Sequence, residues 1–216
     1  MINLLESVFN LTPDGETLDR EGLLKIVQQK APGYDKDRDG HYNLISALHK
    51  SLRGSDTDAA LYWAARMIEG GEDPLYLLRR LTRFAMEDVS LADPNALNVA
   101  IAAWDAYERL GSPEGDIAIA ELVIYLGTAP KSNSAYLAYD AALADINTGK
   151  GQSIPPYMRP SNNYAGYKYP HDFPNRYVVQ QYLPDDLKDR KYYSYAENKT
   201  EQAAMAYWDK IKNSTK

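Results

Sequence analysis

Apolar residues recur along most of this chain at the spacing of an α-helix. Leu75, Leu78 and Leu81 form one such stripe, and Leu97 and Ile101 begin another. A repeat of three or four residues places these side chains on one face of a helix. Alternating runs rich in β-branched residues, which would indicate strands, are almost absent. We therefore expect an all-α protein with helices over residues 1–9, 18–30, 42–53, 56–69, 74–89, 94–110, 114–127, 132–147 and 199–211.

Proline and glycine mark the ends of these segments. Some segments open with a capping residue followed by proline, at Asp73-Pro74, Asp93-Pro94 and Ser112-Pro113. The side-chain oxygen of such a residue accepts a hydrogen bond from the first turn, and proline fits there because it has no N–H to leave unpaired. The helices have similar lengths and short connections. This pattern predicts an antiparallel helical bundle or array.

Residues 148–198, which we call the strap, break this pattern. Six of the twelve prolines lie between Pro155 and Pro184, and nine of the eighteen tyrosines lie between Tyr157 and Tyr195. Such a proline content prevents a long helix, and the aromatic content is too high for an idle linker. We expect an irregular Tyr/Pro-rich strap that lies over the helical body or over a neighbouring subunit. Its candidate interface residues are Tyr164, Tyr167, Tyr169, Phe173, Tyr177 and Tyr182.

Composition limits the classes of function. The 216 residues carry 24 Lys+Arg against 30 Asp+Glu, which gives a formal net charge of −6. An acidic chain does not coat nucleic acid through bulk charge, although a local basic patch is compatible with it. The lack of cysteine excludes disulfides, thiol catalysis and thiolate metal sites. No apolar run reaches the roughly 20 residues that a membrane span needs.

Two patterns resemble ligand sites and fall short of them. Residues 35–41 copy the first half of an EF-hand loop, with acids at Asp35, Asp37 and Asp39, but Ser46 stands where the loop needs a bidentate glutamate. A solvated turn explains this segment better than a calcium site. Residues 148–153 hold two glycines and a lysine without the spacing of a phosphate loop. We predict no metal-binding and no cofactor-binding residue in this chain.

The three histidines offer little catalytic chemistry. His41 and His49 are eight residues apart, which is about 12 Å along a helix, and so cannot share a metal. His171 is the one histidine beside an acid in an irregular segment, and no partnered nucleophile accompanies it. A hydrogen-bonded structural role is the better interpretation. We expect no catalytic residue here.

Basic residues gather locally. Arg79, Arg80 and Arg83 lie on one predicted helix, and Lys50 and Arg53 lie near the end of another. Cations among aromatic rings suit contact with a nucleic-acid strand, because the charges follow phosphates and the rings stack on bases. Solvated faces and ion pairs with the 30 acids are the alternative. The candidate DNA-binding residues are Lys50, Arg53, Arg79, Arg80, Arg83, Lys131 and Lys168.

Several long motifs carry a resemblance to a known family. They occupy residues 34–63, 124–136, 167–174 and 180–184, and the third reads Tyr-Lys-Tyr-Pro-His-Asp-Phe-Pro. Over nearly its whole length, the chain resembles the C-terminal part of the RarA/MgsA family. Members of this family are AAA+ ATPases associated with DNA replication, recombination and repair, and they are related to the Werner-helicase-interacting protein.

The resemblance implies a piece of a larger ATPase. It implies that residues 1–40 are a remnant of the AAA+ helical lid and that residues 41–216 form a C-terminal helical oligomerisation domain. The phosphate loop, the acidic magnesium motif and the sensor arginine of the family are absent from this chain. We therefore expect that the chain is not itself an enzyme and holds no cofactor, while the parent protein binds ATP and Mg as a DNA-dependent ATPase.

The same resemblance implies a function in assembly. We expect a homotetramer that positions the ATPase on DNA forks, gaps and ends, with a single-strand-binding protein as a further partner. It also implies a cytoplasmic, nucleoid-associated protein without a membrane partner. The alternative is a DNA-binding or replication-protein docking module that acts without self-assembly.

Overall fold

The computed structural model describes residue 19 and residues 38–214. Apart from residue 19, the helices expected over residues 1–9 and 18–30 fall outside this part. The regular elements of the described residues are all helical and include no strand, so the all-α prediction is confirmed. Its α-helices are α3 (Arg38–Arg53), α4 (Thr57–Glu69), α5 (Pro74–Phe84), α6 (Ala96–Leu110), α7 (Asp116–Thr128), α8 (Ser134–Asn147) and α9 (Lys199–Ser214).

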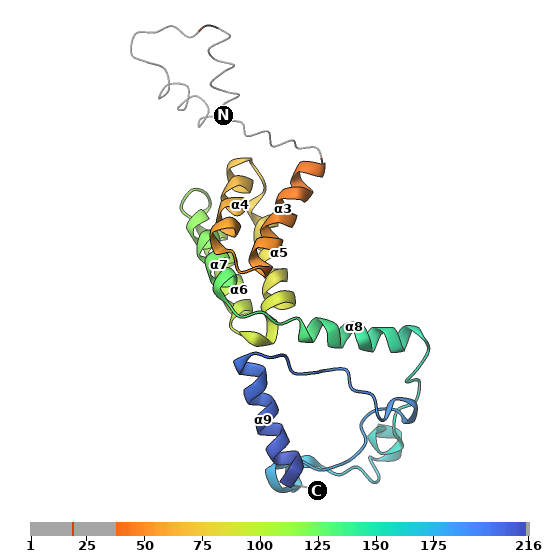
Figure 1. Ribbon diagram of the computed structural model, residues 1–216. Coiled ribbons are helices and arrows are strands. Elements are labelled where there is room, and N and C mark those ends of the chain that lie inside the picture. The colour runs from red at the N-terminus through yellow and green to blue at the C-terminus, as the bar shows by residue number, and fades with distance from the viewer. Residues whose placement is uncertain (1–18, 20–37, 215–216) are drawn as a thin grey trace.

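Helices α3 to α7 form a compact body around one apolar core (Figure 1). Helix α7 lies at its centre and packs against each of the other four helices. Met67, Leu78, Phe84 and Leu126 are fully buried in this core, and each such side chain contributes about 1.5–3 kcal/mol through removal from water. At Gly127 a Cβ would lie 2.7 Å from the Thr57 hydroxyl, so only glycine permits this close approach of α7 to α4.

The helix start predicted after Asp73 is right, whereas the starts predicted over 94–110 and 114–127 lie too early in the chain. The Asp73 carboxylate accepts from the Leu75 N–H at 3.0 Å, as predicted. Helix α6 begins at Ala96, although the Asp93 carboxylate does accept from the Asn95 N–H at 3.2 Å; its other oxygen accepts from the Tyr125 hydroxyl at 2.6 Å. Helix α7 begins at Asp116, and Ser112 donates its hydroxyl to the Asp116 side chain at 2.6 Å.

The predicted helix over 74–89 changes its geometry before it ends. The α-helical part stops at Phe84 and continues as a π-helical turn, η1 (Ala85–Val89), followed by a 3₁₀ turn, η2 (Ser90–Ala92). The wider turn keeps Ala85 and Val89 buried while Glu87 and Asp88 are only partly covered. The Asp88 carbonyl also accepts from the Ser132 N–H at 2.7 Å, which ties this turn to the start of α8.

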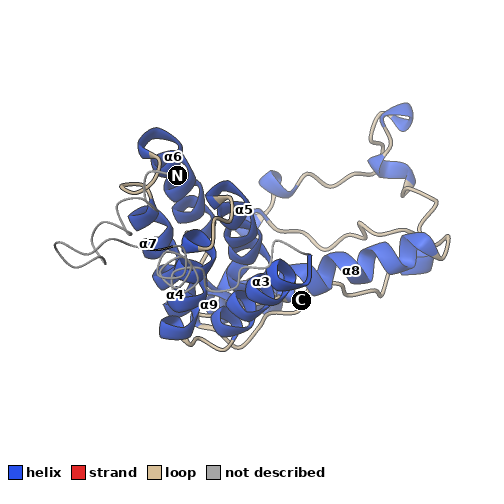
Figure 2. Cartoon of the chain, turned by 90° about the horizontal axis from the view of Figure 1, so that it is seen from above, coloured by secondary structure: helices blue, strands red, loops and turns tan. Residues whose placement is uncertain are grey.

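Helix α8 leaves the body, and the strap returns from its far end to α9 (Figures 1 and 2). The strap contains no α-helix, as predicted, but five 3₁₀ turns: η3 (Pro156–Met158), η4 (Pro160–Asn162), η5 (Pro170–Asp172), η6 (Pro174–Arg176) and η7 (Asp185–Leu187). Both views place it beside α8 and α9 and away from α3–α7. Of the two expected positions, the one over the helical body is therefore wrong, and the one over a neighbouring subunit stays a prediction.

We call α8, the strap and α9 the extension, and helix α9 holds it next to the body. It contacts η2, where the Thr200 hydroxyl donates to the Ala92 carbonyl at 2.9 Å. Across residues 38–214, no helix combines the length and the apolar character that crossing a membrane requires.

Candidate functional site

The predicted basic residues of two helices meet around His49. We call Lys50, Arg53, Arg79, Arg80 and Arg83 the basic face. The His49 ring lies edge-on to the Phe84 ring, with 5.8 Å between centroids, so the end of α3 packs against the end of α5. Arg80, Arg53 and Arg83 all act electrostatically on this histidine. The structure thus brings Arg53 of α3 together with Arg80 and Arg83 of α5, whereas the sequence offers the basic face as one pair and one triplet.

Two of these arginines have carboxylate partners from the η1 turn. Arg53 Nε lies 2.7 Å from Asp88 Oδ1, and Arg83 Nε lies 2.6 Å from Glu87 Oε2. Both arginine side chains remain about half exposed, at 49% and 57%. Ion pairs at this exposure add little stability, so the guanidinium groups can exchange these partners at little cost.

Two buried polar atoms lie at the centre of the basic face. His49 Nε2 and Arg80 Nε are both covered from solvent, and neither has a hydrogen-bond partner among the described residues. The His49 side chain is only 6% exposed. Native structures contain few such atoms, because an unpaired buried polar group costs free energy.

Burial and neighbouring charge keep His49 neutral. Burial, which has the largest effect, and the positive charges of Arg80, Arg53 and Arg83 together lower the pKa of its ring from 6.5 to about 4, against an opposing effect of Glu87. A cation at this position would be desolvated and would face three others.

This environment predicts acid sensitivity. The unfolded chain takes up the His49 proton below pH 6.5 and the native chain does so only near pH 4, so stability is lost as the pH falls through this window. The full loss is about 3 kcal/mol. We expect urea unfolding to show this loss between pH 7 and pH 4, and to show it much reduced in His49→Gln. His171→Gln, in the exposed strap, is the matched control and should follow the wild type; equal curves for all three proteins would contradict the assignment.

Of the two other candidate lysines, Lys131 borders the basic face, where it lines one hollow with Arg53 and Asp88, whereas Lys168 lies apart from it in the strap. The Lys131 ammonium donates to the Ala129 carbonyl at 2.5 Å, the Gly127 carbonyl at 3.2 Å and the Ser55 hydroxyl at 3.1 Å. It therefore caps the C-terminal end of α7, and burial lowers its pKa. Lys168 lies in the strap, where its backbone N–H and carbonyl pair with the Gln180 amide at 3.2 and 2.8 Å.

A second surface is apolar and belongs to α8, the strap and α9. On α8, Leu137 and Tyr139 are 55% and 65% exposed, and on α9 Tyr207 is 61% exposed. Of the candidate interface residues, Tyr177 is half-buried and its ring lies 6.2 Å from that of Trp208. The others are exposed: Tyr164, Tyr167, Tyr169, Phe173 and Tyr182. We call the exposed apolar side chains of α8, the strap and α9 the aromatic face.

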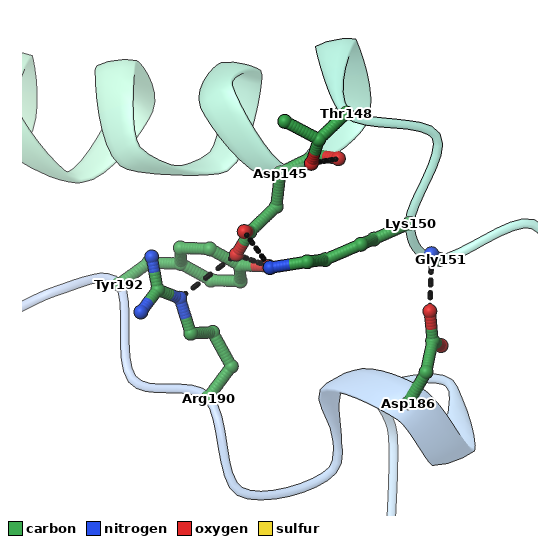
Figure 3. Close-up of polar contacts among 7 residues, drawn as sticks. All are labelled: Asp145, Thr148, Lys150, Gly151, Asp186, Arg190 and Tyr192. Carbon is green, nitrogen blue, oxygen red and sulfur yellow. Dashed lines mark hydrogen bonds and ion pairs between the residues drawn. The ribbon is translucent and has the colours of Figure 1, made fainter.

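Two buried acids, which sequence reasoning missed, fix this surface. Asp145 on α8 meets Lys150, Arg190 and Tyr192 at the base of the strap (Figure 3). Glu201 on α9 accepts from Ser132 and from the residues before the helix. Asn198 and Glu201 have the spacing of a capping box, which is a signal available in the sequence. Asp145 carries no comparable local signal, because its partners lie up to 47 residues away.

The two remaining candidates from the sequence are the EF-hand-like segment and His171. Asp35 and Asp37 of the EF-hand-like segment lie outside the described residues. Within residue 19 and residues 38–214, no three metal-ligating side chains converge. His171 is exposed, with Nδ1 2.6 Å from an Arg176 nitrogen and its ring 5.0 Å from that of Tyr169.

Two family models together match residues 1–212 of the chain. A family model described as "MgsA AAA+ ATPase C terminal" matches residues 54–212, and one described as "AAA C-terminal domain" matches residues 1–53. Replication-associated recombination protein A of Haemophilus influenzae is 45% identical over 204 residues, which cover 89% of this chain and 46% of that protein. The Bacillus subtilis protein of the same name is 44% identical, over 92% and 49%. ATPase WRNIP1 of Dictyostelium discoideum is 40% identical, over 82% and 21%. The chain thus spans about half the length of its bacterial relatives.

Proposed function

Because the chain belongs to the MgsA family of AAA+ ATPases and holds its C-terminal domain, we propose that it joins copies of the whole protein into a tetramer and positions them on branched or gapped DNA. In this proposal, ATP and Mg bind to the nucleotide-binding core of the whole protein, which hydrolyses ATP in a DNA-dependent manner. A single-strand-binding protein is a further partner, and the assembly works at the bacterial nucleoid.

The aromatic face is the observation that carries the proposal. It presents large apolar side chains on both ends of the extension, with Tyr139 on α8 and Tyr207 on α9 more than 60% exposed. Exposed apolar surface of this kind is typical of an interface, and aromatic side chains are enriched in the centres of interfaces. Among the described residues, no three His, Asp or Glu side chains converge to hold a metal ion, so the aromatic face supports self-association better than metal binding.

The shape of the extension favours a second copy of the same chain as the partner. Helix α8 is apolar on most of its circumference, with Leu137, Tyr139 and Ile146 all exposed. A helix that is apolar all round is normally buried on all sides. Within one chain, η2 contacts α8 and the base of the strap reaches its far end, but Leu137, Tyr139 and Ile146 stay exposed. A closed assembly would cover them.

The test is the mass of the protein in solution. At tens of micromolar, light scattering should give about four times 24.3 kDa. The double variant Tyr139→Asp/Tyr207→Asp places two charges in the aromatic face, and we expect its mass to fall to 24.3 kDa.

Tyr62→Asp is the matched control. Tyr62 lies on α4 of the helical body and is 58% exposed, so it receives the same substitution at the same exposure on another surface. It should keep the mass of the wild type. A wild-type mass near 24.3 kDa at these concentrations would overturn the proposal, because assembly would then need the rest of the protein.

A further inference from the structure

The basic face holds more positive charge than the chain around it neutralises. Its five cations stand against two carboxylates, Glu87 and Asp88, in a chain whose net charge is −6. Fixed like charges on neighbouring helices repel one another, so such a cluster costs stability unless an anion joins it. Other surfaces of the protein have acids in excess, which makes this concentration of charge a property of one site.

Among the described residues, Arg80 is the member of the basic face whose side chain keeps a nitrogen without a partner. Its neighbours Arg53 and Arg83 have carboxylates at 2.7 and 2.6 Å, whereas Arg80 Nε is buried without a hydrogen-bond acceptor. His49 Nε2, beside it, is also unpaired, on a side chain that is more than nine-tenths buried. Both atoms are covered from solvent, so they mark uncompensated polar groups inside the basic face, and a ligand would meet the less buried part of the Arg80 side chain.

The chemistry of these groups selects an anion with several oxygens. A guanidinium presents its N–H groups in a planar fork that matches phosphate or carboxylate oxygens. The half-exposed Arg53 and Arg83 flank the site, and exposed Lys50 and Arg79 extend it along α3 and α5. A row of cations over two helices suits a repeated anion better than a single small one.

An aromatic side chain lies at the edge of this row. Tyr136, in the first turn of α8, is 44% exposed. Its hydroxyl is hydrogen-bonded to Asp140, and Glu87 and Arg83 both lie near enough to act on it electrostatically. An exposed ring beside phosphate-binding cations is the combination on which a base of a strand stacks.

We propose that the basic face binds the phosphate backbone of a nucleic acid, with Arg80 at the centre of the contact. This inference rests on the DNA-positioning part of the proposed function and gives it a location on the body, apart from the aromatic face. Contacts to phosphates carry no base information, so binding is independent of sequence. It weakens as salt rises, because each phosphate contact releases counterions.

The test compares binding of fluorescent single-stranded and duplex oligonucleotides, by anisotropy, across a series of salt concentrations. Arg79→Gln/Arg80→Gln removes two cations while it leaves the Arg53–Asp88 and Arg83–Glu87 pairs in place. We expect this variant to bind about tenfold more weakly, and the slope of log K against log salt to fall by about 1.4 for a single strand or 1.8 for a duplex.

Arg109→Gln/Lys191→Gln is the matched control, because it removes the same charge from exposed positions on α6 and in the strap. It should change the affinity by less than twofold. A wild type that does not bind at low salt, or an equal loss in both variants, would overturn the proposal. As a second measurement, the His49 ring resonances should shift on addition of the single strand to the wild type; a strand that binds without moving them would place the site elsewhere.

The solution mass separates this inference from the self-association. If the Arg79→Gln/Arg80→Gln variant keeps the mass of the wild type and loses binding, the basic face is confirmed independently of assembly. If the wild type is monomeric and still binds through these arginines, the assembly proposal fails and the basic face stands.

Discussion

Replacement of Glu201 by alanine is expected to lower the free energy of unfolding by about 3–5 kcal/mol. The Glu201 carboxylate is 2% exposed and accepts from Ser132 Oγ at 2.5 Å, Tyr193 Oη at 2.8 Å, Asn198 Nδ2 at 2.8 Å and the Ala196 N–H at 3.0 Å. These donors come from the α7–α8 connection, from the end of the strap and from the residues before α9. Alanine would leave all of them buried without an acceptor.

The pKa of Glu201 supports the size of this effect. Burial alone would raise it, but the hydrogen bonds from Ser132, Ala196, Asn198 and Tyr193 lower it from 4.5 to about 2. The folded state therefore favours the ionised carboxylate by about 3 kcal/mol. This contribution is complete above pH 4.5 and is lost as the pH falls toward 2.

Urea unfolding at neutral pH measures the change in stability. Glu197→Ala is the matched control, because Glu197 precedes the same helix with its side chain exposed. It should stay within about 0.5 kcal/mol of the wild type. A Glu201→Ala protein of wild-type stability would show that α9 is held by its apolar contacts alone.

The sequence predicts the helical body because each of its helices follows a local rule. The apolar stripe of α5 and the cap at Asp73 need no tertiary information, and both are found in the structure. The same local rule misplaces the start of α6 after Asp93, whose carboxylate also accepts a hydrogen bond from the Tyr125 hydroxyl, 32 residues away. It fails again at the end of α5, where burial of Val89 widens the last turn into a π-helix.

The candidate sites show the same difference between local patterns and contacts between distant residues. The arginines of α5 are visible in the sequence as charges on one helix, but nothing local shows that Arg53 of α3 joins them around His49. The unpaired nitrogens of His49 and Arg80 follow from packing alone. Whether the basic residues bind DNA and whether the strap tyrosines form an interface remain predictions.

Asp145→Asn is expected to release the strap from α8. Asp145 is 5% exposed and receives Lys150 Nζ at 3.0 Å, Arg190 Nε at 2.8 Å and Tyr192 Oη at 3.1 Å (Figure 3). Lys150 begins the strap, and Arg190 and Tyr192 lie near its end, so this carboxylate closes the strap as a loop. Asparagine has nearly the same size, but it has no charge and directs an amide N–H₂ at two cations.

The hydrogen bond from Lys150, together with Tyr192 and Arg190, lowers the pKa of Asp145. The carboxylate is therefore charged at neutral pH, and the closure is lost only as the medium becomes strongly acidic. Beside it, the Gly151 N–H donates to Asp186 Oδ2 at 2.9 Å, a second and weaker link across the same base. The variant should therefore open the strap at its base while α3–α7 stay folded.

Limited trypsin digestion measures this opening, because Lys168, Arg176 and Lys188 lie within the strap and none of them is followed by proline. We expect cleavage there to be about tenfold faster in Asp145→Asn, since cleavage follows the population of the open state. Asp140→Asn, at an exposed position of the same helix, should be cleaved at the wild-type rate. If the strap contributes to the tetramer, Asp145→Asn also lowers the mass in solution without touching an exposed aromatic side chain. Rapid cleavage with an unchanged mass would restrict the interface to α8 and α9.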